Sequence, residues 1–120
     1  MAGKQFLILF VVILAVQFMY AQTSTGFEKG QIIPNVVCQI APDQSYALYL
    51  PEAYSPEKKW PILYLFEPAA RSMIPMKRFQ ETAEKYGYIL LCSNNSRNGP
   101  SRVIINAIKA VWIDSHKRLS

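Results

Sequence analysis

Few side chains in this 120-residue sequence are suited to nucleophilic catalysis. The only histidine of the sequence is His116. Among the serines, Ser93 and Ser96 follow an apolar run. A nucleophilic serine needs a base within reach and, on α/β scaffolds, a G-x-S-x-G turn that exposes its hydroxyl; the sequence contains no such motif. We therefore expect His116 to complement the dipole of a helix end, and both serines to hydrogen-bond local backbone in turns.

Three charged residues follow two strongly apolar segments. Glu67 comes directly after residues 62–66 and is followed by Arg71, and Arg97 lies shortly after residues 89–92. Ligands of open α/β sheets bind beyond the carboxyl ends of the strands, so all three are candidate substrate-side residues. Glu67 either contacts substrate or anchors its own loop as a hydrogen-bond acceptor. The arginines either bind a substrate carboxylate or tie two loops together.

Other kinds of site find little support in the sequence. Cys38 and Cys92 each lie within an apolar run, which favours small buried side chains over a disulfide. Both are far along the chain from His116, so we expect neither a metal site nor a cofactor. The formal charge of +5 comes from scattered lysines and arginines, which argues against a nucleic-acid partner.

Four predicted strands position these residues. Residues 32–40 are rich in β-branched side chains, residues 45–50 alternate, and turn residues lie between them, so the two segments are expected to form an antiparallel pair. Residues 62–66 and 89–92 are continuously apolar, a pattern typical of strands covered on both faces in a parallel sheet. The proline-rich residues 51–61 are expected to form an exposed loop.

Two predicted helices complete the pattern. The first crosses between the two buried strands in a βαβ unit and ends at Gly87. Its apolar stripe consists of Met76, Phe79, Ala83 and Tyr86. The second helix is expected from about Ser101 to His116, with a buried stripe of Ile104, Ala107, Ile108, Val111 and Trp112.

The N-terminus has the layout of an export signal. Lys4 precedes an apolar run over residues 5–20, and the small residue Ala21 follows it. We expect residues 1–21 to be a cleaved signal peptide that directs the protein to a secreted or periplasmic location. A membrane anchor is the alternative, but the run is shorter than the ~20 residues that span a bilayer, so no stable anchor is expected. Residues 22–31 are expected to be a flexible lead-in, and residues 32–120 a partial α/β domain.

Several short segments, in this order, resemble the opening of secreted α/β-hydrolases of the feruloyl-esterase and polyhydroxybutyrate-depolymerase type. They are Tyr46-Ala-Leu-Tyr-Leu-Pro51, Ile62-Leu-Tyr-Leu-Phe66, Glu67-Pro-Ala-Ala-Arg71, Glu84-Lys-Tyr-Gly-Tyr88 and Ser93-Asn-Asn-Ser-Arg-Asn-Gly-Pro100. The resemblance runs from about Ile32 onward. It implies the N-terminal part of an α/β-hydrolase sheet, with an antiparallel strand pair, a βαβ unit and a further helix.

In that family the nucleophile, acid and base follow the second helix, so the resemblance implies an inactive N-terminal fragment of an exported serine carboxylic-ester hydrolase. Its substrate, once the enzyme is completed, is a small-molecule ester. The loop after residues 62–66 resembles the segment that donates a backbone N–H to the oxyanion hole. Pro68 has no N–H, which leaves Ala69 or Ala70 as the donor. The alternative is a non-catalytic exported α/β scaffold for binding or interaction.

Overall fold

A computed structural model describes residues 3–4 and 26–119 of the chain. The elements in chain order are β1 (Ile32–Val37), β2 (Ser45–Tyr49), β3 (Ile62–Leu65), α2 (Met73–Tyr86), β4 (Ile89–Ser93) and α3 (Ser101–Leu119). Each expected strand and helix is present, with ends displaced by up to three residues. The predicted signal peptide and the first part of the predicted lead-in, residues 22–25, lie outside the described residues, apart from residues 3 and 4.

The strands form one mixed sheet in the order β1-β2-β4-β3. β1 pairs antiparallel with β2, and β2 pairs antiparallel with β4. β3 and β4 are parallel, with Leu63 opposite Leu90 and Leu65 opposite Cys92. The expected antiparallel pair and the expected parallel strands joined through a helix are therefore confirmed, and the fold is mixed α/β.

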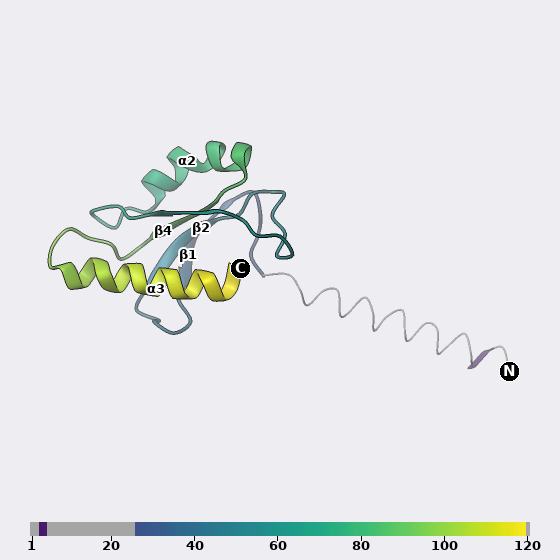
Figure 1. Cartoon of the computed structure of the whole chain (residues 1–120), viewed down its shortest axis with the longest axis horizontal. Helices are drawn as coiled ribbons and strands as arrows, with labels where there is room; N and C mark the ends of the chain where they lie inside the picture. Colours follow the sequence, from purple (N-terminus) through teal and green to yellow (C-terminus); the bar gives the residue numbers. More distant parts are fainter. Residues whose placement is uncertain (1–2, 5–25, 120) are drawn as a thin grey trace.

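α2 and α3 pack on opposite faces of this sheet (Figure 1). Alternate strand residues point to each helix because successive side chains of a strand face opposite ways. Tyr46, Leu48 and Leu91 belong to the core cluster beneath α3, whereas Tyr49 and Leu90 belong to the cluster beneath α2. All five residues of β4 are buried, as the continuous apolar pattern of that strand predicts.

α2 ends where the sequence predicts. Gly87 has a φ of 72°, and its N–H donates to the carbonyl of Ala83. This left-handed conformation favours glycine because a Cβ would be strained there. The cap directs the chain from the helix into β4 and so completes the parallel pair.

Three expectations about burial are wrong. β3 is an edge strand among the described residues, and Leu63 is 40 % exposed instead of being covered on both faces. The outer positions of both predicted helix stripes are exposed too: Phe79, Tyr86, Ile108 and Trp112. They are exposed because each helix contacts the sheet through a narrower line of smaller residues, and because no described element covers the far side of β3.

A buried carboxylate ties α3 to the β1 side of the sheet. The Asp114 side chain is 1 % exposed. It accepts hydrogen bonds from the Tyr46 hydroxyl at 2.8 Å and the Gln39 N–H at 2.8 Å, and Arg118 pairs with it at 3.0 Å. Burial, followed by this hydrogen bond, raises the pKa of Tyr46. Arg118 belongs to α3 itself, whereas Tyr46 lies in β2 and Gln39 follows β1, so the last two hydrogen bonds fix α3 against the sheet.

The described end of the predicted lead-in contacts the domain. Phe27 packs against the core cluster beneath α3, and its ring lies 4.7 Å from the Arg118 guanidinium carbon. The Gly30 N–H donates to the carbonyl of Leu50 at 2.8 Å. Within residues 3–4 and 26–119, no helix is long and apolar enough to cross a membrane.

Candidate functional site

The loops that follow β3 and β4 meet beyond the carboxyl ends of these parallel strands. An antiparallel bridge pairs Ala69 with Arg97, and the Asn98 N–H donates to the carbonyl of Pro68 at 2.8 Å. The Ser96 hydroxyl donates to the carbonyl of Glu67, also at 2.8 Å. The structure thus brings together the residues that the sequence singled out after each strand, and among them Ser96 joins the two loops through its side chain.

Glu67 anchors its own loop. One carboxylate oxygen accepts the N–H groups of Ala69 and Arg71 at 2.7 and 2.8 Å, and the other accepts the Arg71 guanidinium. The hydrogen bonds from the Arg71 side chain and backbone lower the pKa of Glu67 to about 2. Of the two roles open to Glu67, this geometry is the loop-anchoring one, and Arg71 ties its own loop and not the neighbouring one.

Both candidate oxyanion donors are engaged in this arrangement. The Ala69 N–H donates to the Glu67 carboxylate, and the Ala70 N–H donates to the Glu67 carbonyl at 3.1 Å. Ala70 has a φ of 58°, which is unusual for a residue with a Cβ. The backbone N–H groups of this turn therefore surround an anion, as in an anion-binding nest. The anion is the carboxylate of Glu67 itself.

Arg97 differs from Arg71. Both arginines are exposed, but the Arg97 side chain makes no hydrogen bond or ion pair with any other described residue. It lies on the rim of a hollow of about 150 Å³ between the two loops. The lining consists of Phe66, Glu67, Pro68, Ser96, Arg97, Asn98, Gly99 and Ile104.

Asn94, the first residue after β4, forms hydrogen bonds to three other segments. It was not singled out from the sequence. Its amide nitrogen donates to the carbonyl of Pro34 at 3.1 Å and to the Ser45 hydroxyl at 3.0 Å. Its amide oxygen accepts from Ser72, the residue before α2. One side chain thereby connects β1, β2, β4 and α2. The signal available in the sequence was an asparagine directly after a buried strand, where ligands and loop anchors gather.

Two of the three remaining candidates, Ser93 and His116, have a partner close to them in the sequence. The Ser93 hydroxyl accepts the Asn95 N–H at 3.0 Å, as expected of a turn serine. Ser96 bonds a carbonyl 29 residues away, so the expectation of a local partner is wrong for it. His116 lies in the last turn of α3, with Nδ1 at 2.9 Å from the Trp112 carbonyl and 3.4 Å from the Tyr64 hydroxyl.

Both cysteines are buried free thiols. Cys38 belongs to the core cluster beneath α3 and Cys92 to the cluster beneath α2, so the sheet separates them. Burial raises the pKa of each thiol to about 11. Residues 3–4 and 26–119 contain no group of three histidine, cysteine or acidic side chains able to hold a metal ion.

Two apolar hollows flank the outer side of β3. On the α3 side, Trp60, Tyr64 and Trp112 help to line a space of about 470 Å³. On the α2 side, Leu63, Phe79 and Tyr88 line one of about 330 Å³. A strand laid beside β3 could place side chains into both hollows, because its residues alternate between faces.

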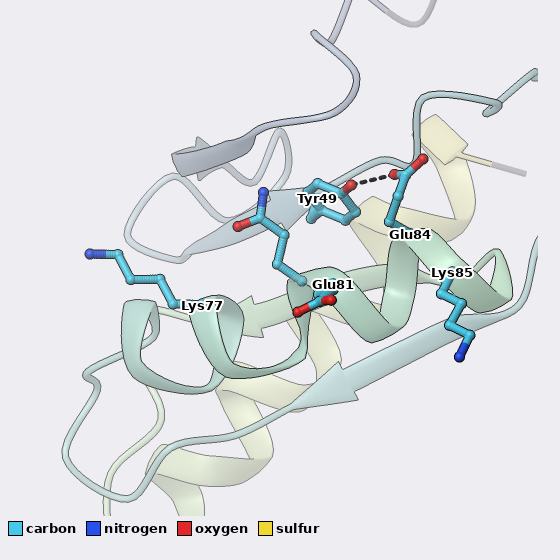
Figure 2. A pocket seen from close by; sticks show the side chains of 6 residues that line it. Tyr49, Lys77, Glu81, Glu84 and Lys85 are labelled. Carbon is cyan, nitrogen blue, oxygen red and sulfur yellow. Dashed lines mark hydrogen bonds between the residues drawn. The ribbon is translucent and has the colours of Figure 1, made fainter.

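A further hollow of about 480 Å³ lies away from these loops, between β2 and α2. Figure 2 shows Tyr49 and Glu84 facing each other there, with Lys77, Glu81 and Lys85 arranged along the helix. The Tyr49 hydroxyl donates to Glu84, and burial followed by this bond raises the pKa of Tyr49. The Glu84 carboxylate also accepts the Glu52 N–H at 3.1 Å, so its contacts secure the loop after β2.

Comparisons with known proteins identify no relative. No family model matches the sequence, and no curated protein and no solved structure matches the chain.

Proposed function

We propose that the chain is the N-terminal part of an exported serine carboxylic-ester hydrolase, and that the loops after β3 and β4 form the substrate side of its site. Residues 1–120 contain no G-x-S-x-G motif, so the proposal assigns the nucleophile and its partners to sequence outside them. Because residues 1–120 lack this motif, we expect them to be inactive on their own.

The observation that carries the proposal is the convergence of the two loops beyond the carboxyl ends of parallel β3 and β4. Substrates of open α/β sheets bind at this edge because helix starts and loop backbones are presented there. The hollow between the loops is small and partly apolar, and its lining includes two charged residues, Glu67 and Arg97. Such a space suits part of a small ester.

The side of β3 that pairs with no described strand supports the same proposal. A strand added there would extend the parallel part of the sheet, and its side chains would fill the apolar hollows against α2 and α3. Its carboxyl end would then lie beside the two loops. We propose that the nucleophile is presented from that position.

Ala69 is the better oxyanion candidate of the two alanines. Its N–H is held by the Glu67 side chain, so rotation of that side chain releases the donor. The Ala70 N–H is held by the Glu67 main-chain carbonyl, so its release requires the turn itself to change. An oxyanion hole must be organised before reaction, which favours the donor that is freed without moving backbone.

The engaged state of both N–H groups favours a second function, a non-catalytic exported scaffold. A loop whose donors are all satisfied internally has no need of a bound oxyanion. In that case the open side of β3 and the hollow between the loops would serve binding alone.

An active-site label distinguishes the two functions. The exported gene product is treated with a fluorophosphonate, which modifies an activated serine, and is digested for mass spectrometry. We expect the protein to hydrolyse a short aryl ester before treatment and not after it. We expect the label on a serine outside residues 1–120. Absence of both label and turnover in a folded exported protein would support the scaffold instead.

Export is tested in the same preparation. Cleavage after Ala21 gives a mature N-terminus at Gln22, which mass spectrometry detects directly. An intact Met1 on protein extracted from membranes would favour the anchor over the cleaved signal.

A further inference from the structure

One positively charged side chain that lines the hollow between the β3 and β4 loops has no hydrogen-bond or ion-pair partner among the described residues. Two arginines lie on these loops, Arg71 and Arg97. Arg71 is paired with Glu67, and three of the hydrogen bonds within that loop come from its backbone and guanidinium. The hydrogen bonds and charge of Glu67 raise the pKa of Arg71, so the pair stays ionised and contributes little net charge.

Arg97 has no such counter-charge. No other described residue forms a hydrogen bond or ion pair with its side chain. Its backbone is nevertheless fixed, by the bridge to Ala69 on one side and by the Asn98 N–H bond to Pro68 on the other. A guanidinium on a fixed backbone at the rim of a hollow can pair with a planar carboxylate through two parallel hydrogen bonds.

The rest of the lining limits what accompanies that carboxylate. Phe66, Pro68 and Ile104 provide apolar surface, and the Asn98 side chain provides an amide with no partner among the described residues. The volume of about 150 Å³ is below the range of pockets that enclose whole drug-sized ligands. It suits a short apolar chain that ends in an acid.

We propose that this hollow binds the carboxylate end of a short-chain acid through Arg97, and that the ester taken by the enzyme carries a free carboxylate. The second half of this inference rests on the proposed function, whereas the first half concerns binding alone. Glu67 lines the same hollow but does not repel the ligand, because its charge is already paired with Arg71.

Binding is tested on the exported protein, labelled with ¹⁵N, by titration with succinate and with neutral succinamide. We expect succinate to shift the amide signals of residues 97–99 saturably in the millimolar range, about −4 kcal/mol, and succinamide to shift them much less. Arg97→Gln should weaken succinate binding about tenfold, because a charge-assisted pair is lost. Arg102→Gln is the matched control, since Arg102 is an exposed arginine at the start of α3 that does not line the hollow.

Equal shifts with succinate and succinamide, or unchanged succinate binding in Arg97→Gln, would overturn the inference. Because Arg97 is exposed, the variant is expected to fold, which its amide spectrum verifies. Hydrolysis separates the two proposals. If the exported protein cleaves monomethyl succinate no better than methyl butyrate, and Arg97→Gln changes neither rate, the substrate inference fails while the esterase stands. If succinate binds through Arg97 but no ester is cleaved, the esterase fails while the carboxylate site stands.

Discussion

The two edge strands of the sheet, β1 and β3, differ in how their free edges are protected against pairing with another strand. β1 carries a register shift between Ile33 and Val36, and Asn94 donates to the carbonyl of Pro34 within this irregularity. At its end, the carbonyl of Val37 accepts the Arg118 guanidinium at 3.1 Å. Bulges, proline and side-chain bonds of this kind prevent another strand from pairing with an edge.

β3 has none of these features in the part of the chain that the structure describes. Its register with β4 is regular from Ile62 to Leu65, and most of the side chains that line the two hollows beside it are apolar or aromatic. The exposed Leu63 and Trp112 lie on opposite faces of this open side. Among the described residues, β1 is therefore protected against pairing with a further strand, whereas β3 is not.

The largest expected effect on stability comes from removing the buried carboxylate of Asp114, which connects α3 to the β1 side of the sheet. Asp114→Ala leaves Tyr46, Gln39 and Arg118 without their common acceptor, and breaking a buried charged pair typically costs ~3–5 kcal/mol. Urea unfolding followed by tryptophan fluorescence measures the change. Glu81→Ala, which removes an exposed helix carboxylate, is the control and should change the free energy of unfolding by less than ~0.5 kcal/mol. Similar losses in both variants would contradict the role given to Asp114.

The open side is tested by adding charge. Exposed apolar surface along a free strand promotes association, so we expect the chain alone to bind a hydrophobic dye and to self-associate. Leu63→Lys should weaken that association about tenfold, because the new charge resists burial at the edge. Sedimentation velocity measures it. Val37→Lys, at a similarly exposed position of β1, should have little effect. A monomeric, dye-free wild-type chain would show that β3 needs no neighbour.

The loop that follows β3 carries a smaller, local strain. Ala70 has a φ of 58°, where glycine has no Cβ penalty. Ala70→Gly is expected to raise the free energy of unfolding by ~0.5–1 kcal/mol, the excess of relieved strain over the added freedom of the unfolded chain. Ala69→Gly lacks this relief and should lower stability by a similar amount. If both variants are destabilised, the turn does not strain Ala70.

The smallest effect concerns pH and the Glu67–Arg71 pair. The pKa of Glu67 is lowered to about 2, so its stabilising contribution is complete above the unfolded value near ~4.3 and is lost as pH falls through about 2. Titration of the glutamate side-chain carboxyl signals by NMR measures this directly. Arg71→Gln should move the Glu67 midpoint upward. A wild-type midpoint near the ordinary glutamate value would mean that the pair does not persist in solution.

Much of the architecture was predictable because its signals are local. The β-branched and alternating runs of β1 and β2, the continuous apolar runs of β3 and β4, and Gly87 at the end of α2 each depend on a few neighbouring residues. The position of Glu67, Arg71 and Arg97 beyond two strands also followed from order along the chain. That the two loops meet was implied by the parallel pairing of those strands.

Burial could not be predicted from the same patterns. Ala107, Ile108, Val111 and Trp112 repeat at helical spacing, and the buried stripe was predicted to contain all four. α3 buries Ala107 and Val111, together with Ala110, but leaves Ile108 and Trp112 exposed. Helical spacing identifies an apolar side of a helix and not how much of it is covered, since coverage depends on which strand lies at the edge. For the same reason an apolar run such as residues 62–66 does not distinguish a central strand from an edge strand.

The sequence by itself determined the elements, their order and the charged residues at the carboxyl ends of the strands, because propensity and periodicity act between near neighbours. Only the tertiary structure decided that Arg71 is neutralised by Glu67 while Arg97 is not, and that Asp114 is a buried acceptor. These differences depend on hydrogen-bond distances between groups brought together by the fold, and the strength of a charge depends on its burial and partners.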